Sequence, residues 1–258
     1  MVQKQGGFPA FDIAVTDVKT NVSLDLPIPD TVRDAVPPAV KVASEKLGDG
    51  VWYLTGGSHH SMLVEFRDHV AVIEAPLTEA RSEAVIAEVK KLVPGKPIRY
   101  LISTHHHFDH SGGLRTYIAE GATIVTHQSN KAFYERVAKL PHTLNPDRLS
   151  RERKKAKILA VGARHVLTDG AQTIEIHHIQ GNPHNEGILM AYLPKDMILV
   201  EVDVYTPLAP NAAPPATPNP NTVNLYENIE RLKLDVGPIA PLHGRLVALA
   251  DLRKTIGK

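Results

Sequence analysis

The stretch STHHHFDHSGG, residues 103–113, contains four histidines and one aspartate and ends in two glycines. Histidine has no strong preference for helix or strand, so local secondary structure does not explain this density of imidazole. His105, His107, Asp109 and His110 stand in the order H-x-H-x-D-H. Alternate residues at the end of a strand point the same way, so His105 and His107 are expected to face one metal ion. A bend at the glycines then lets Asp109 and His110 face a second ion close by.

Three later residues are also possible metal ligands at places where a strand runs into a loop. His184 lies in QGNPHNEG, Asp203 ends the apolar run MILVEVD, and His243 lies in APLHG. A rigid sheet can aim such side chains at a shared rim. Glu201 competes with Asp203, but we favour Asp203 because it ends the strand and has the shorter side chain. The chain has no cysteine, and zinc accepts imidazole and carboxylate where thiolate is absent.

The composition is that of an ordinary globular protein: 43% of the 258 residues are hydrophobic, which argues against wholesale disorder. The formal net charge of +1 gives no general electrostatic reason to bind nucleic acid or anionic lipid. No apolar run approaches the roughly 18 residues of a membrane span. The N-terminal residues also lack the apolar core of a signal peptide. We therefore expect a soluble protein, either cytoplasmic, or periplasmic or secreted if a leader has been removed.

The N-terminal part of the chain differs in pattern from the rest. Residues 11–16 alternate apolar with polar or small side chains and predict a strand, whereas residues 20–45 hold four prolines and no sustained period. We expect residues 1–46 to form an N-terminal strand and a proline-rich arm. A chain that opens inside a strand leaves open that this segment is the remnant of a preceding domain. Residues 47–258 are expected to form one domain.

From residue 47 the hydrophobic pattern alternates between strand and helix periods. Strands are predicted over residues 50–57, 61–66, 69–76, 98–103, 122–127, 165–180, 187–205 and 237–244. Helices are predicted over residues 79–93, with Thr78 as N-cap, and over residues 113–119, 129–139 and 224–236. A loop with six prolines, residues 206–222, precedes the last helix. Strands with helices between and after them in both halves predict an α+β fold of two facing sheets with helices outside.

The order H-x-H-x-D-H, then one histidine, one aspartate and one histidine, resembles the metallo-β-lactamase superfamily over about residues 47–250. The resemblance implies a four-layer αββα sandwich that binds two metal ions. It assigns the first ion to His105, His107 and His184, and the second to Asp109, His110 and His243, with Asp203 bridging. The motif looks most like that of glyoxalase II, but only 15 residues follow His243, where that enzyme continues into a helical domain. A bridging aspartate favours lactonase-like or esterase-like members.

This ligand set predicts a dinuclear zinc hydrolase, with iron or manganese as other metals that the same donors accept. A hydroxide shared by the two ions attacks a carbonyl carbon, and Asp109 is the best candidate to carry a proton to the leaving group. We expect a small-molecule substrate with a carboxylic ester, a lactone or a strained amide. A phosphodiesterase or nuclease on the same fold and a mononuclear iron persulfide dioxygenase are the alternatives. The sequence is silent on oligomeric state.

Two further side chains are candidates for binding the substrate. His59, in GGSHHSM, is expected to border the pocket, with a solvated turn as the alternative. Tyr205 is expected to donate to a substrate oxygen, with a packing tyrosine as the alternative. Glu74, in VIEAP, stands where the resemblance implies an aspartate. The basic run DRLSRERKKAK, residues 147–157, is interpreted as a solvated helix face, and nucleic-acid contact is the less favoured reading.

Overall fold

The computed structural model describes residues 1–5, 8–36 and 38–258, which divide into two units, Met1–Ala39 and Val40–Lys258. The N-terminal unit contains the antiparallel hairpin of β1 (Val2–Gln5) and β2 (Phe8–Asp12) and the short helix α1 (Asp30–Arg33). The strand predicted over residues 11–16 therefore ends earlier, at Asp12. Asp12 pairs with Val2, the first residue of β1, and beyond this pair Ile13 exchanges hydrogen bonds with Met1.

The second unit begins at Val40, and its first strand is β3 (Ala43–Gly48). The expected arm is therefore wrong for residues 43–46, which pair antiparallel with β4 (Val51–Thr55). The strand was missed because its sequence, ASEKLG, shows no apolar alternation. It lies at the edge of a sheet with most of its side chains exposed, where polar residues are tolerated.

The first sheet has seven strands in the order β3-β4-β5-β6-β7-β8-β9. The remaining strands are β5 (Ser61–Glu65), β6 (Val70–Ile73), β7 (Ile98–Ile102), β8 (Thr123–His127) and β9 (Lys157–Val161). Pairing is antiparallel from β3 to β6 and parallel from β6 to β9. β5 and β6 are buried on both faces, which explains their nearly continuous apolar sequences.

The second sheet has six strands in the order β10-β11-β12-β13-β14-β15. They are β10 (Arg164–Thr168), β11 (Thr173–His178), β12 (Leu189–Leu193), β13 (Ile198–Glu201), β14 (Pro238–Pro241) and β15 (Val247–Ala248). All neighbours pair antiparallel except β13 and β14, which are parallel. The loops after β11, β13 and β14 carry His184, Asp203 and His243, respectively.

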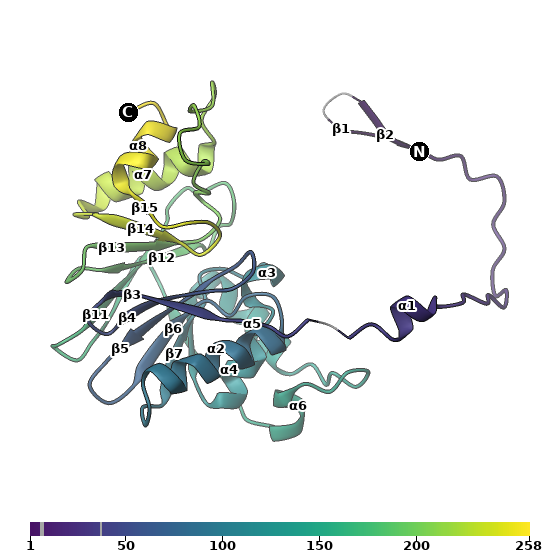
Figure 1. The fold of residues 1–258 in the computed structure, drawn as a ribbon, viewed down its shortest axis with the longest axis horizontal. Coiled ribbons are helices and arrows are strands. Elements are labelled where there is room, and N and C mark those ends of the chain that lie inside the picture. Colours follow the sequence, from purple (N-terminus) through teal and green to yellow (C-terminus); the bar gives the residue numbers. More distant parts are fainter. Residues whose placement is uncertain (6–7, 37) are drawn as a thin grey trace. The chain divides into compact units, whose positions relative to one another are not determined.

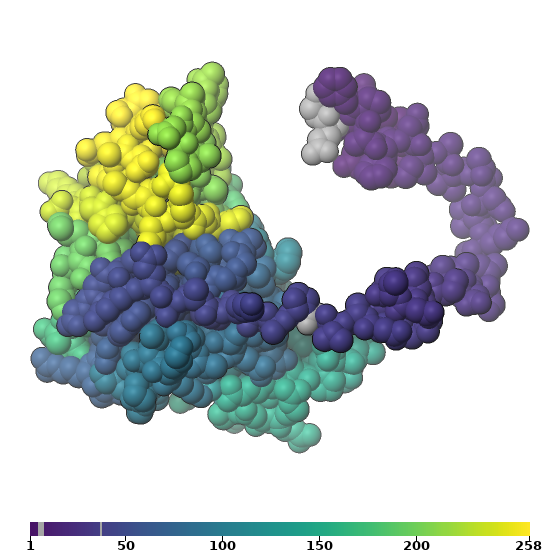
Figure 2. All heavy atoms as spheres, viewed as in Figure 1, coloured from purple at the N-terminus to yellow at the C-terminus, as the bar shows by residue number. Residues whose placement is uncertain are grey.

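Helices cover the outer face of each sheet (Figure 1). The longer helices are α2 (Glu79–Leu92), α4 (Leu114–Glu120) and α5 (Lys131–Ala138) on the first sheet, and α7 (Pro220–Leu232) and α8 (Leu249–Thr255) on the second. One apolar core lies between the sheets, and a further core lies under the helices of each sheet. In Figure 2 the first half of this unit, in blue to teal, lies against the second half, in green to yellow. The unit therefore has four layers.

Two helix starts show how local chemistry sets the boundaries. The Thr78 side chain accepts a hydrogen bond from the backbone of Arg81 at 3.2 Å, which confirms it as the N-cap of α2. Helix α7 begins at Pro220, earlier than the predicted residue 224. Asn219 caps it, and a proline in the first turn removes an N–H that would have no helical partner.

Helix α8 and strand β9 lie where the sequence indicated no element. Residues 249–255 form α8, and residues 157–161 form β9, which begins at Lys157, the last residue of the basic run. Within that run only α6 (Arg148–Glu152) is helical, because Arg153 ends it with a positive φ of 54°. No helix in the described part of the chain is both long enough and apolar enough to cross a membrane.

Candidate metal centre

The histidine-rich motif lies in a loop and a short helix rather than at the end of a strand. β7 ends at Ile102, and His105 and His107 lie in the loop before α3 (Phe108–Ser111). Their ring centroids are 4.5 Å apart even so. The two side chains therefore lie close together, as expected. They do so in a loop, so the expectation that they alternate along a strand is wrong.

The glycines behind the motif allow close packing rather than an unusual backbone bend. Gly112 has an ordinary helical φ of −59°. A Cβ atom added to it would lie 2.1 Å from the carbonyl oxygen of Leu77. Any larger residue at position 112 would therefore push the helical turn that carries Asp109 and His110 away from the loop after β6.

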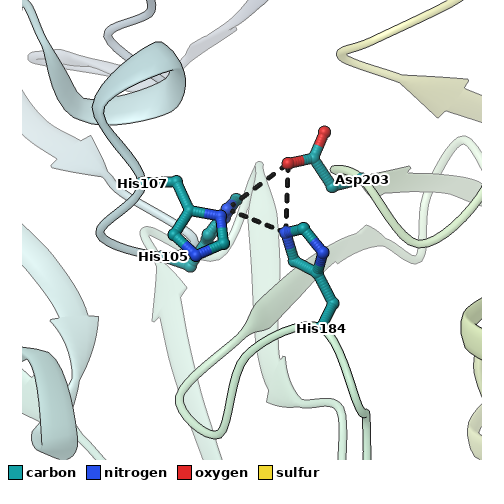
Figure 3. Close-up of side chains that lie close together, drawn as sticks. All are labelled: His105, His107, His184 and Asp203. Atoms are coloured by element: carbon teal, nitrogen blue, oxygen red, sulfur yellow. Dashed lines mark hydrogen bonds and ion pairs between the residues drawn. The ribbon is translucent and has the colours of Figure 1, made fainter. Parts of the chain in front are cut away.

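Four side chains from three loops form the first cluster of possible ligands: His105, His107, His184 and Asp203. Each offers one atom that lies within 4.8 Å of the others. The Oδ2 atom of Asp203 lies 3.4 Å from His105 Nε2 and 3.2 Å from His184 Nε2, contacts drawn as dashed lines in Figure 3. The two histidine nitrogens are 3.4 Å apart. The structure therefore brings together residues that are almost a hundred positions apart in the sequence.

Asp203 reaches the centre because the chain turns sharply after β13. Asp203 has a φ of 62°, a left-handed conformation that aspartate tolerates better than most residues. The Oε2 atom of Glu201 accepts hydrogen bonds from the backbone N–H groups of Val204 at 3.3 Å and Tyr205 at 3.1 Å. Burial raises the pKa of Glu201 well above its ordinary value. Glu201 is thus not the competing ligand but the residue that closes this turn.

A second cluster lies beside the first and shares Asp203 with it. His110 Nε2 is 3.0 Å from Asp203 Oδ2 and 3.7 Å from Asp109 Oδ2. His243 Nδ1 is 3.4 Å from the other Asp203 oxygen, Oδ1. His59 also belongs to this region, because its nearest ligand nitrogen lies within 4.8 Å of those of His110 and His243.

Glu74 supports the loop and short helix that carry the histidine motif. The Oε1 atom of this buried side chain accepts a hydrogen bond from Thr104 N at 2.6 Å, and its Oε2 atom lies 3.6 Å from His110 Nδ1. Burial raises the pKa of Glu74 to about 7. A glutamate after β6 thus holds the loop in place. Its side chain is longer than that of the aspartate that the resemblance implies, and its backbone has a positive φ of 69°.

The charges at the centre favour metal binding. Burial lowers the pKa of His105 to about 4, so its ring is neutral near pH 7. Burial also opposes the charged forms of Asp203 and His110, but their mutual contact outweighs it. The pKa of Asp203 is held far below its ordinary value by His105 and His110, and that of His110 is raised by Asp203 and Glu74. The neutral ring of His105 beside the firmly ionised carboxylate of Asp203 is a donor pair that zinc binds, whereas His110 would have to lose the proton that Asp203 and Glu74 favour before it could bind an ion.

Buried polar atoms in the centre provide an independent test of that fit. His59 Nε2 and both ring nitrogens of His110 are buried and have no hydrogen-bond partner among the described residues. Such atoms are costly to leave unpaired in a protein interior. Coordination of a metal ion would satisfy His59 Nε2 and His110 Nε2, while His110 Nδ1 faces Glu74, so the residues present fit a zinc site.

Tyr205 lies outside the centre, so its predicted contact with the substrate is wrong. Its side chain is 2% exposed and packs in the core beneath α7 and α8. Its hydroxyl lies 3.4 Å from Thr255 Oγ1. The turn at Asp203 reverses the direction of the chain, so the residue two positions later faces the core.

One residue that supports the motif loop, Tyr134, was not identified from the sequence. The hydroxyl of Tyr134, which is buried in α5, donates to the His105 carbonyl oxygen at 2.7 Å and lies 2.8 Å from Ser103 Oγ. Nothing in the local sequence distinguishes Tyr134 from a packing tyrosine, since its role depends on how α5 folds back over the motif.

The chain is similar to known proteins in sequence and in fold. Residues 54–189 match the family described as "Metallo-beta-lactamase superfamily". A metallo-beta-lactamase from Pontibacter korlensis superposes with a TM-score of 0.63 at 16% identity, covering 84% of this chain and 98% of that one. The DIM-1 metallo-beta-lactamase superposes with a TM-score of 0.62 at 18% identity, covering 84% of this chain and 96% of that one. A metallo-beta-lactamase from Hirschia baltica superposes with a TM-score of 0.60 at 21% identity, covering 83% of this chain and 95% of that one.

No curated protein matches the chain. The αββα fold predicted from the sequence is confirmed.

Proposed function

Since this chain belongs to the metallo-beta-lactamase superfamily and is a metal-dependent hydrolase, we propose that it is a dinuclear zinc hydrolase of carboxylic esters, lactones or strained amides. One observation supports this most directly. Asp203 touches imidazoles of both proposed sets: Oδ2 lies near His105 and His184 of the first set and near His110 of the second, and Oδ1 lies near His243 of the second. A carboxylate between two sets of imidazoles is what a pair of metal ions requires.

The first ion would be held by His105, His107 and His184, and the second by Asp109, His110 and His243, with Asp203 shared between them. When bound, two such ions lower the pKa of water toward about 7 and polarise the oxygen of a carbonyl group. The chain's own contribution is to hold the ligands in place before the substrate arrives. Glu74 and Glu201 supply that support from the two sheets.

Asp109 is the residue that we expect to move a proton. Its side chain is 32% exposed, more than that of Asp203 at 11%, so it is open to substrate and solvent. Its Oδ2 atom faces His59 and His110, which leaves the other carboxylate oxygen able to deliver a proton to a leaving group.

A cavity of about 440 Å³ beside the centre is the best candidate for the substrate pocket. Its volume is in the range typical of small-molecule sites. His60 and Gly244, the chain neighbours of His59 and His243, line it together with Tyr53 and Arg245. Glu45, Thr55 and Leu246 complete the wall. The Arg245 guanidinium is held by hydrogen bonds from Nε and Nη2 to the Leu208 carbonyl oxygen.

The structure weakens the case for a phosphodiesterase or nuclease. Only the basic run supported that alternative, and three of its six cations, Arg148, Arg151 and Lys154, form ion pairs within the protein. Arg148 lies 2.8 Å from Glu120, and Lys154 lies 3.0 Å from Glu152. The persulfide dioxygenase alternative needs a single iron ion, and the second cluster of ligands argues against it.

A panel of substrates on zinc-loaded protein tests the proposal, beside a chelator-treated control. It comprises lactones, aryl esters, a phosphodiester and, because the matched structures are named metallo-beta-lactamases, a chromogenic cephalosporin. We expect two zinc ions per chain by metal analysis and hydrolysis of at least one carboxyl substrate that the chelator abolishes. One bound iron ion, or phosphodiester cleavage faster than that of every carboxyl substrate, would overturn the proposal.

A further inference from the structure

His59 is buried although it lies in a loop, between β4 and β5. Its side chain is 7% exposed. The ring stacks on that of His243, with centroids 4.3 Å apart and planes 24° apart, and its centroid lies 4.8 Å from that of His110. A loop histidine bordering a pocket would be expected to keep one face in solvent. This one is instead enclosed by residues of the second cluster.

The distances around His59 Nε2 are those of metal ligands rather than of hydrogen bonds. His59 Nε2 lies 3.5 Å from Asp109 Oδ2, and His110 Nε2 lies 3.7 Å from the same oxygen. Good hydrogen bonds to oxygen are shorter, about 2.7–3.2 Å. Two ligand atoms around one tetrahedral zinc ion lie roughly 3.3 Å apart, given bonds of about 2.0–2.1 Å. His59 Nε2 is also buried with no hydrogen-bond partner in the described part of the chain.

The other ring nitrogen of His59 has the partner that metal-binding histidines usually have. Nδ1 lies 2.8 Å from Ser58 Oγ. When Nδ1 donates its proton to that hydroxyl, Nε2 presents its lone pair toward Asp109 and His110. His60 differs, because its ring packs edge-on against Tyr53 at 5.2 Å and lines the neighbouring cavity.

We propose that His59 binds the second metal ion directly through Nε2, together with Asp109, His110 and His243. The inference rests on the proposed dinuclear function and replaces the substrate contact expected from the sequence. With His59, the second ion has three imidazoles and a carboxylate besides the shared Asp203. The first ion has three imidazoles besides Asp203, so we expect it to keep the more open position for substrate.

The experiment measures the affinity of both sites for zinc by competition with a chromophoric chelator. In His59→Ala the second dissociation constant should rise more than about 100-fold, because even a residue that only orients a ligand is worth 10–100-fold. The first constant should change by less than about 3-fold, which also shows that the variant is folded. His60→Ala, in the same loop, should keep both constants within about 3-fold.

The Co²⁺-loaded protein supplies a readout that does not depend on activity. The visible spectrum that appears with the second equivalent should change in His59→Ala and stay unchanged in His60→Ala. His59→Gln keeps an amide of similar reach, so it carries the test if the alanine variant does not fold, and it should bind the second ion more weakly than wild type. Wild-type affinity and an unchanged spectrum in a folded His59 variant would overturn this inference alone. Fewer than two ions in the wild-type protein would overturn the proposed function.

Discussion

Two fully buried glutamates, Glu74 and Glu201, hold comparable places in the two sheets. Glu74 directly follows β6 and Glu201 ends β13. Each accepts a backbone N–H group from a loop that presents proposed ligands, Thr104 in the case of Glu74 and Val204 in the case of Glu201. In each residue one carboxylate oxygen, Oε2 of Glu74 and Oε1 of Glu201, is buried without a hydrogen-bond partner among the described residues.

The two glutamates differ in what else their carboxylates contact. Glu74 Oε2 lies 3.6 Å from His110 Nδ1, so Glu74 acts on a ligand ring as well as on the backbone. Glu201 contacts the backbone after Asp203 and thereby fixes the turn with its positive φ. The same residue type therefore supports the centre in two ways: one glutamate orients a side chain, whereas the other sets a loop conformation.

The largest effect is expected where the two halves of the centre meet. Asp203→Ala removes the carboxylate that faces both clusters, so both zinc affinities and kcat/KM should fall by more than about 100-fold. Metal analysis after dialysis and the rate on the best carboxyl substrate measure this. If Asp203→Ala retained two tightly bound ions, the centre would not depend on a shared carboxylate.

A carboxylate remote from the centre provides the matched contrast. Asp147 caps α6 and pairs with the buried Arg115, with one bond of 2.9 Å from Arg115 Nη2 to Asp147 Oδ1. Asp147→Ala should lower the free energy of unfolding by about 3 kcal/mol, because it leaves Arg115 buried without its partner. Zinc affinities should stay within about 3-fold of wild type. Chemical denaturation and the chelator titration separate the two effects.

The same pair predicts a dependence on pH. Hydrogen bonds from Arg115 hold the pKa of Asp147 well below its ordinary value of 3.8. A lowered pKa in the folded state adds stability above the unfolded pKa, and this is lost as the pH falls below about 3.8. The stability of Asp147→Ala should therefore approach that of wild type in acid. Denaturation curves of the metal-free proteins at several pH values check this.

Glu201 variants test whether this residue acts only through the backbone. Glu201→Ala leaves two buried N–H groups unpaired and should cost about 2 kcal/mol of unfolding free energy. Glu201→Gln keeps an oxygen that can accept from both N–H groups, so it should cost less than about 1 kcal/mol. Thermal or chemical unfolding of the zinc-free proteins measures both values. Equal losses in the two variants would contradict the assigned role.

The smallest change is expected at Glu74, and it should affect metal binding more than stability. Glu74→Gln retains an oxygen for the Thr104 N–H group but replaces the acceptor opposite His110 Nδ1. The affinity for the second ion should fall by about 10-fold, with the first ion nearly unaffected. Comparison with Glu201→Gln sharpens the contrast, since that substitution should leave both affinities close to wild type.

Sequence reasoning succeeded where a local pattern carries the information. The helix over residues 79–93 and its Thr78 cap follow from spacing and side-chain chemistry within one turn. It failed for β3, whose exposed edge position leaves its sequence without apolar alternation, and for α8, a helix of seven residues whose apolar contacts come only from Leu249, Leu252 and the adjacent Ile256. It also failed for Tyr205, because the face to which a residue points after a turn is not a local property.

The sequence by itself predicted the candidate donor residues and their order along the chain, since the absence of cysteine and the motif leave only imidazole and carboxylate. It also determined the layered fold, because hydrophobic periods fix which faces must be buried. Only the tertiary structure decided that His59 lies with Asp109 and His243, and that Asp203 rather than Glu201 enters the centre. The physical reason is that loop conformations are set by hydrogen bonds and packing between segments that the sequence keeps far apart.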